Sequence, residues 1–266
     1  MAGFNGGVIL GPAIGGALAH AVGPAHTCFV VGGAIAGSAL LASRLVPETR
    51  GIHTIGDVSD PPETQSAGDV VRELWTTWNS ETSHELRRLC VANLAFFATI
   101  AGANMTVLPL VLTGDMGLAP AIVGSLFAIN AGVSLAATLP VAKVADKLGP
   151  SNIIVPALLA TAGAFAYLPW ASHHGYEFVA LAMAVQGLGS CVLGSAPTAA
   201  AANAVPEEER AGALALLRVC GDLGLLTGSA GFGALAAAAG SDAAFGAASV
   251  LLVGTAARFR YLAPSK

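Results

Sequence analysis

The residues with the clearest chemical potential are Arg218 and Asp222, four positions apart within the apolar run 211–239. On a helix this spacing puts both side chains on one face, where they can form an ion pair. Asp222 is the only acid well inside a strong apolar run, and a carboxylate at the centre of a bilayer costs about 2.5–3.5 kcal/mol. We therefore expect a gating or structural ion pair, a proton-carrying carboxylate or, if the pair lies shallower, an interfacial ion pair.

Four further polar residues are candidates for binding or gating. The amides Asn104, Asn130 and Gln186 lie inside apolar runs and are candidate solute contacts. Buried amides need hydrogen-bond partners, which a neighbouring helix can supply as well as a solute. Asp146 is expected in a short polar connection, where it could accept hydrogen bonds from a helix N-terminus or simply remain exposed.

Other kinds of chemistry have little support in the sequence. The four cysteines are scattered singly and form neither a metal-ligand pair nor a redox motif. No nucleophile, base or metal cluster is assembled, so neither an enzyme nor a bound cofactor or metal is expected. The net charge of −4 and the lack of a basic patch do not indicate nucleic-acid binding.

The elements that carry these residues are membrane helices. The 266 residues are 55% apolar and 11% charged, with a mean hydropathy of +0.70. Apolar runs of about 18–25 residues can span a bilayer core of about 30 Å. Eight such runs occur, at 3–21, 26–46, 89–113, 119–141, 152–170, 178–204, 211–239 and 243–259. They predict an all-α, multi-pass membrane bundle.

The basic residues predict how these spans are oriented. All 12 Lys and Arg lie in, or near, alternate connections and the C-terminal end, whereas the other four connections contain none. Because positive charge is retained on the cytoplasmic side, both termini are predicted to be cytoplasmic. The long connection 47–88 places Val70, Val71, Leu74, Trp75 and Trp78 near one helical face. This amphipathic helix lies either on the membrane surface or against the bundle.

Glycine spacing predicts two closely packed helices. Gly7, Gly11 and Gly15 recur every four residues, with Pro12 able to bend the helix and Gly16 completing the stretch. Small residues of this kind let helix backbones approach closely in lipid. Aligned without gaps, Gly7, Gly11 and Gly16 correspond to Gly224, Gly228 and Gly233. The two stretches are six spans apart, as in a parallel duplication of six helices, and that plan would place four spans before Met1.

These residues resemble the major facilitator superfamily. Gly7-x3-Gly11-Pro12-x2-Gly15-Gly16 is similar to its fifth-helix motif, which is characteristic of proton-coupled drug antiporters. The stretch 142–151, AKVADKLGPS, resembles the family's loop signature through Asp146, Lys147 and Gly149. The copy is partial, because Ala142 replaces a glycine and Pro150 and Ser151 replace the trailing basic pair. The stretch 47–51, PETRG, is similar to sequences that follow helices of this family.

The resemblance implies an arrangement for the whole chain as helices five to twelve of a twelve-helix fold that lacks its first four helices. Residues 1–46 would be the last two helices of the N-terminal bundle, 47–88 a cytoplasmic linker and 89–266 the C-terminal bundle. Asp146 would latch the inward-closed state, and the helices that carry Asn104, Asn130 and Gln186 would line the cavity.

The implied function is secondary transport of a small organic solute by alternating access, in exchange with protons. The expected partners are the solute, protons, the lipid bilayer and either the missing helices or a full-length partner. On this interpretation the chain does not transport alone. The alternative is a truncated, non-transporting membrane protein that assembles with or regulates a full-length transporter.

Overall fold

The computed structural model describes residues 11, 14–19, 21–45, 68, 72, 76, 78 and 83–261. Gly7 and Pro12 of the N-terminal glycine motif lie outside these residues, as do Val70, Val71, Leu74 and Trp75 of the predicted amphipathic helix. Of that helix, Trp78 is described, and it packs against the hydrophobic core. Its carbonyl oxygen accepts a hydrogen bond of 2.8 Å from Nε of Arg87.

Helices form the described part of the chain, and seven of them are long and apolar enough to cross a membrane. They run over Ala25–Arg44, His84–Asp115, Pro120–Leu148, Pro150–His174, Tyr176–Ala204, Arg210–Ala239 and Ser241–Tyr261. These are the second to eighth spans expected from the sequence, and the prediction of an all-α, multi-pass membrane bundle is confirmed. The first expected span, 3–21, lies mostly outside the described residues.

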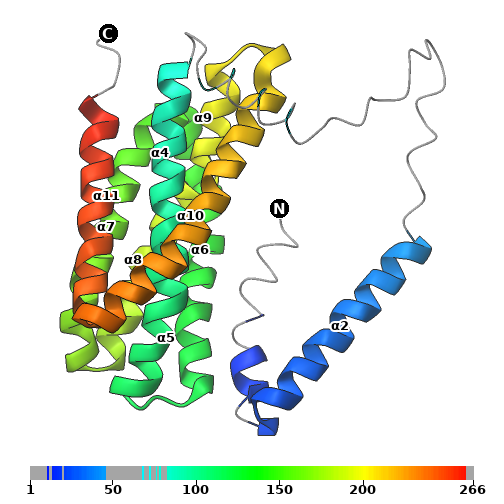
Figure 1. Cartoon of the computed structure of the whole chain (residues 1–266), viewed down its shortest axis with the longest axis vertical. Coiled ribbons are helices and arrows are strands. Elements are labelled where there is room, and N and C mark those ends of the chain that lie inside the picture. The colour runs from blue at the N-terminus through cyan, green and yellow to red at the C-terminus, as the bar shows by residue number, and fades with distance from the viewer. Residues whose placement is uncertain are drawn as a thin grey trace.

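The helices are built from apolar runs that begin and end at proline, glycine and polar residues (Figure 1). Their bounds are α2 (Pro24–Leu45), α4 (Ser83–Thr99), η1 (Ile100–Val107), α5 (Leu108–Leu110), η2 (Val111–Asp115), α6 (Pro120–Leu148), α7 (Pro150–His174), α8 (Tyr176–Leu193), α9 (Ala196–Ala204), η3 (Glu207–Glu209), α10 (Arg210–Ala239) and α11 (Ser241–Tyr261). The segments η1 and η2 are π-helical, and η3 is a 3₁₀ turn.

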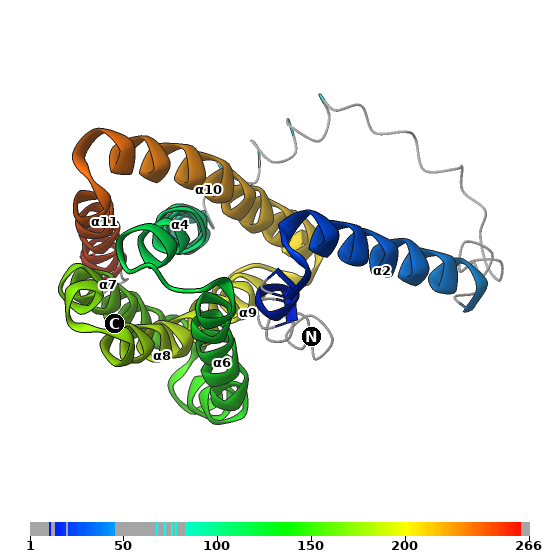
Figure 2. The ribbon, with the colours of Figure 1, turned by 90° about the horizontal axis from the view of Figure 1, so that it is seen from below.

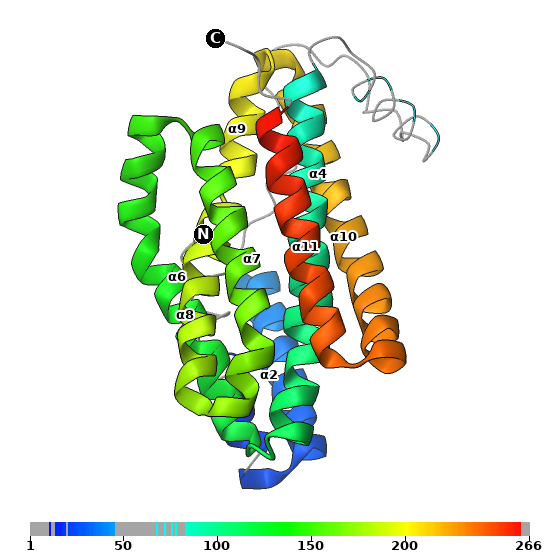
Figure 3. The same cartoon turned by 90° about the vertical axis from the view of Figure 1, so that its left-hand side faces the viewer.

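The six spans of residues 83–261 pack into one bundle with a continuous apolar core. Viewed along the bundle, α4 lies between α10 and the remaining helices, with α6 at the edge (Figure 2). Fully buried side chains such as Phe165 of α7 and Phe245 of α11 fill the interior. In a second side view α11 lies beside α7 and α4 (Figure 3). By contrast, only 6% of the apolar window of α2 is buried.

The basic residues of this bundle gather at one end. Successive spans run in opposite directions, so the starts of α4, α7 and α10 meet the end of α11 there (Figure 1). Lysine and arginine at that end are Arg87, Arg88, Lys143, Lys147, Arg210, Arg258 and Arg260. The turns at the opposite end, around 116–119, 175 and 240, contain no lysine or arginine. The helix directions therefore agree with the charge pattern.

Three differences from the helix boundaries expected from the sequence are the largest. α4 begins six residues before the expected 89. α6 continues to Leu148, past the expected end at 141, and stops where Gly149 adopts φ +85° and Pro150 begins α7. The expected span 178–204 is broken between α8 and α9, because Pro197 in the first turn of α9 has no backbone N–H. A hydropathy profile gives the length of an apolar run, whereas the backbone conformation determines where each of these helices begins and ends.

The span that contains Asn104 is unusually wound. Its central residues Ile100–Val107 and its end Val111–Asp115 are π-helical, on either side of the short α5 that contains Pro109. The Thr106 hydroxyl donates a hydrogen bond of 2.7 Å to the carbonyl oxygen of Ala101, five residues earlier. Pro109 has no backbone N–H to donate to the α-helical hydrogen bonds, and this missing bond accounts for the departure from α-helical winding in this region. π-Turns in helices often occur at functional sites.

Glycines bring α10 close to the span that begins with α4. A Cβ at Gly224 would collide with the backbone of Leu94, and one at Gly228 with the backbone of Ala98. A Cβ at Gly102 of η1 would likewise collide with the carbonyl oxygen of Gly228 and with the Phe232 side chain. In lipid, this close approach supplies the packing that a hydrophobic driving force supplies in water.

The N-terminal glycines contact the bundle at one described position. A Cβ at Gly16 would lie 2.7 Å from the carbonyl oxygen of Pro120 and 3.2 Å from Cα of Gly124, at the start of α6. Gly11 and Gly15 have nothing within 4 Å of a Cβ among the described residues. Gly233, the aligned partner of Gly16, has ordinary van der Waals contact with Thr106. The two glycine stretches thus differ in their contacts.

Candidate functional site

The α4–α10 contact positions Arg218 and Asp222. Asn93 of α4 donates a hydrogen bond from Nδ2 to the carbonyl oxygen of Leu217 in α10, at 2.8 Å. One turn further along α10, a Cβ at Gly221 would lie 2.9 Å from Asn93 Nδ2 and 3.1 Å from the Phe97 ring. This interface fixes the rotation of α10 about its axis, and therefore the direction in which its charged side chains point.

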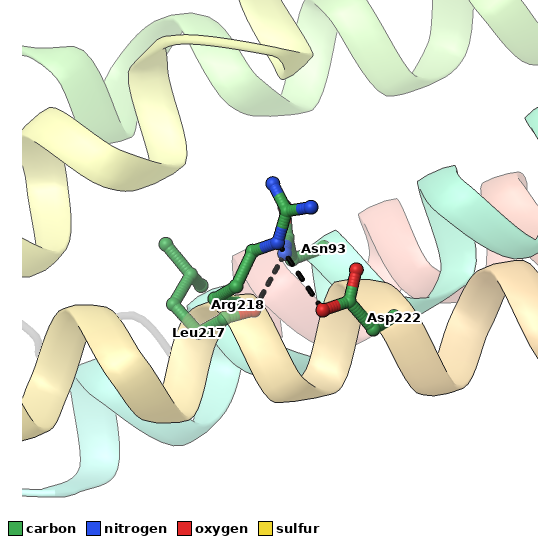
Figure 4. A network of polar contacts seen from close by, with 4 residues as sticks. All are labelled: Asn93, Leu217, Arg218 and Asp222. Carbon is green, nitrogen blue, oxygen red and sulfur yellow. Dashed lines mark hydrogen bonds and ion pairs between the residues drawn. The ribbon is translucent and has the colours of Figure 1, made fainter. Parts of the chain in front are cut away.

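Arg218 and Asp222 form an ion pair along one face of α10. Nε of Arg218 lies 3.2 Å from Oδ2 of Asp222, and the side chains are 78% and 53% exposed (Figure 4). Figure 4 shows both side chains on the same side of the helix, beside the Asn93–Leu217 hydrogen bond. A single Nε contact leaves the terminal guanidinium nitrogens available to another acceptor.

A pocket of about 310 Å³ opens beside this ion pair. It lies between α4, α10 and the break between α8 and α9, so the interruption at Gly194 helps to shape it. Its lining combines two charges, an amide, a hydroxyl and an apolar wall. The lining residues are Asn93, Phe97, Gly194, Thr198, Leu214, Leu217, Arg218, Gly221, Asp222 and Leu225.

The length of α10 indicates how deep Asp222 would lie if the helix is centred in a bilayer. α10 has 30 residues, so it is about 45 Å long, with its centre about 22 Å from Arg210. Asp222 lies twelve residues after Arg210, or about 18 Å along the axis. With the helix centred in a hydrocarbon core of about 30 Å, Asp222 is about 10 Å inside the boundary. Charges at such depth face a protein interior or a water-filled cavity, where they pair.

Asn130 and Gln186 lie together, away from this pocket's lining. Asn130 Nδ2 donates to the carbonyl oxygen of Met183 at 3.1 Å and to Gln186 Oε1 at 3.3 Å, which links α6 to α8. Gln186 is 1% exposed, and its Nε2 has no hydrogen-bond partner among the described residues. Of the two alternatives for these amides, the geometry favours hydrogen bonding to the neighbouring helix.

Asn104 and Asp146 occupy two further places in the bundle. Asn104 is buried in η1, and its Oδ1 has no hydrogen-bond partner among the described residues. Asp146 was expected in a connection, but it lies in the last turn of α6, where its side chain is exposed. The longer α6 explains the difference, because the chain stays helical until Gly149. Neither residue lines the pocket beside Arg218.

Sequence reasoning missed Asn93, Phe97 and Thr198. Asn93 lies four residues after the expected span start at 89 and has the same residue type as Asn104, so the argument used for Asn104 could have found it. Thr198 and Phe97 carried no such signal, because a small hydroxyl and an aromatic ring are common in membrane helices. Among the described residues, no group of three or more His, Cys, Asp or Glu side chains is placed to hold a metal ion.

The fold and the site define a polytopic membrane protein with charged side chains facing a pocket between its helices. Residues 89–266 match the family model of the Major Facilitator Superfamily. This match covers about two thirds of the chain, which belongs to the Major Facilitator Superfamily. Its members are transporters rather than enzymes and act on small solutes within the lipid bilayer. A search of curated proteins found no match.

Proposed function

We propose that this protein is a secondary transporter that exchanges a small organic solute for protons by alternating access. In this proposal the pocket beside Arg218 and Asp222 contributes to the solute site, and Asp222 carries the coupling proton. Family membership and the seven membrane helices support a membrane transporter. The single observation that carries the rest is the Arg218–Asp222 ion pair, whose side chains are 78% and 53% exposed, lie within a span and line a pocket.

The ion pair suggests a simple coupling scheme. When Asp222 is ionised, its carboxylate accepts the Arg218 Nε hydrogen bond, and the two charges cancel. A proton that binds to Asp222 neutralises the carboxylate and leaves the guanidinium without its counter-ion. The freed guanidinium can then turn across the pocket towards α9, where it competes with the solute for the pocket. Proton binding thereby changes which contacts α10 makes in the pocket.

The other polar residues have separate roles in this proposal. Asn93 holds α10 against α4 and keeps Arg218 turned towards the pocket, while Thr198 and Phe97 contact the solute. Asp146, at the end of α6, latches one conformational state through the adjacent end of α7, and the linker 47–88 lies on the cytoplasmic side. The buried acceptor of Asn104 receives a hydrogen bond from solute or water during the transport cycle.

The test is solute binding measured together with proton release. The purified chain is screened in weakly buffered solution against a panel of small organic solutes, with a pH-sensitive dye reporting protons. We expect a bound solute to release protons from the wild type, because solute and proton compete in exchange. Asp222→Asn should abolish that release, while Asp242→Asn, an exposed acid at the other end of the bundle, should retain it. Equal proton release in wild type and Asp222→Asn would contradict the proposed role of Asp222.

A further inference from the structure

Four ring side chains form a connected group where α7 turns into α8. Trp170 stacks on His174 with a centroid distance of 3.9 Å and an interplanar angle of 19°, and its ring lies 5.2 Å from that of Tyr167. Phe178 of α8 packs edge-on against Trp170 at 5.1 Å. These four residues are called the α7–α8 aromatic cluster. Aromatic contacts of this geometry stabilise one another beyond simple burial.

The cluster remains open to the surroundings although its rings pack together. Trp170 is 45% exposed and Phe178 is 38% exposed. His174 Nδ1 lies 2.8 Å from the carbonyl oxygen of Trp170, so the imidazole is held one turn above the indole. The stacked imidazole restricts the orientation of the indole. The cluster therefore presents a large aromatic surface of defined orientation.

The surface of α7 changes character along its length at the cluster. Leu159 lies eleven residues before Trp170, on the same face of the helix, and is 47% exposed. Between them, this face exposes small residues, Gly163 and Ala166. Beyond Trp170 the exposed residues become polar, with His173 and His174 at the end of the helix. The order is apolar, then aromatic, then polar.

The level of Trp170 matches the edge of a bilayer. α7 has 25 residues, so it is about 37 Å long and exceeds a hydrocarbon core of about 30 Å by about 7 Å. Trp170 lies four residues, or about 6 Å, before the end of the helix. Tryptophan is enriched at this level because its apolar ring and its indole N–H suit the boundary between hydrocarbon and headgroups.

We propose that the α7–α8 aromatic cluster is a lipid-contact surface that holds this corner of the bundle at the membrane–water interface opposite the basic residues. The partner is the headgroup and glycerol region of that leaflet. Along the exposed face of α7, lipid chains contact Leu159 and its small neighbours. The inference rests on the membrane location of the bundle and does not depend on the proposed solute or proton chemistry.

The test uses the native tryptophan as a depth reporter. Trp75 and Trp78 are the other tryptophans, so Trp75→Phe with Trp78→Phe leaves Trp170 alone. The protein is reconstituted in phosphatidylcholine vesicles whose acyl chains carry bromine either near the headgroup or deep in the core. We expect the shallow bromines to quench Trp170 fluorescence at least twofold more strongly than the deep bromines.

The matched control moves the reporter along the same helix face. Leu159→Trp with Trp170→Phe, in the same background, places the indole about 16 Å deeper. This variant should show the reverse order, with the deep bromines quenching more strongly. If the double Phe background does not fold, the difference between wild type and Trp170→Phe in each lipid isolates the Trp170 signal.

Three outcomes would overturn the proposal. Stronger quenching of Trp170 by deep bromines would place it inside the hydrocarbon core. Protection from all brominated lipids and from aqueous acrylamide would show that another helix or a second copy covers the cluster. Quenching by acrylamide without quenching by any brominated lipid would place the cluster in water.

Discussion

Asn93 of α4 donates its Nδ2 hydrogen bond to the carbonyl oxygen of Leu217, the residue immediately before Arg218. The contact joins residues 124 positions apart and is buried. It ties the helix that contains the charged pair to α4, which packs directly against α10 and also lines the pocket. The rotation of α10 is therefore set by one amide as well as by glycine packing.

Replacing Asn93 should destabilise the bundle and weaken the pocket. Asn93→Ala removes one interhelical hydrogen bond, which in membrane proteins is worth about 0.6 kcal/mol on average and up to about 1.7. We expect a lower thermal midpoint for the purified protein and weaker solute binding. Asn203→Ala, at an exposed position of α9, is the control and should leave the midpoint unchanged. Equal midpoints for both variants would show that the Asn93 contact is not important for stability.

Neutralising one partner of the ion pair should be worse than neutralising both. Arg218→Gln or Asp222→Asn leaves a single charge deep in a span, at a cost of up to about 2.5–3.5 kcal/mol where it faces hydrocarbon and less where the pocket holds water. Arg218→Gln together with Asp222→Asn removes both charges. We expect the double variant to be more stable in thermal unfolding than either single variant. Additive losses would indicate that the two side chains do not interact in the folded protein.

Two glycines three residues apart on α10 should respond differently to the same change. Gly228→Ala places a methyl group against the Ala98 backbone, whereas Gly231 has nothing within 4 Å of a Cβ among the described residues. Overpacking of this kind typically costs about 1–3 kcal/mol. We expect Gly228→Ala to lower the thermal midpoint clearly and Gly231→Ala to leave it unchanged or slightly raised. A similar loss in both would point to backbone flexibility rather than packing.

Local patterns in the sequence were sufficient for the helices and for the ion pair. An apolar run of spanning length predicts a membrane helix wherever it lies in the chain, and a spacing of four predicts that Arg218 can reach Asp222 on the same helix. Neither inference needs knowledge of which helices are neighbours. The salt bridge between these residues at 3.2 Å depends on helix geometry alone.

Features that depend on neighbouring helices were not predictable in this way. The hydrogen bond from Asn93 requires α4 to lie against α10, and the pocket requires the break between α8 and α9. Asn130 and Gln186 were candidates for a solute contact or for a hydrogen bond to a neighbouring helix, and only the packing of α6 against α8 brings them to each other. The position of Asp146 was missed because charged residues at a helix end look like a connection in a hydropathy profile.

The topology prediction can be tested at four exposed residues. In a background with all four native cysteines replaced, single cysteines are introduced as Lys147→Cys, Arg258→Cys, Asp115→Cys and Asp242→Cys. The helix directions put the first two at the basic end of the bundle and the last two at the opposite end. Because basic residues are retained in the cytoplasm, a membrane-impermeant maleimide should label only Asp115→Cys and Asp242→Cys in intact cells.

Permeabilised cells provide the control for this experiment, since all four cysteines should then react. Reaction of Lys147→Cys and Arg258→Cys alone in intact cells would reverse the orientation but leave the bundle unchanged. Labelling of Lys147→Cys together with Asp242→Cys would instead contradict the helix directions. The helices α6 through α11 place these two residues at opposite ends of the bundle. Redirecting the helices between them would carry several basic side chains across the bilayer. Each basic residue costs about 2.5–3.5 kcal/mol at the centre of the bilayer.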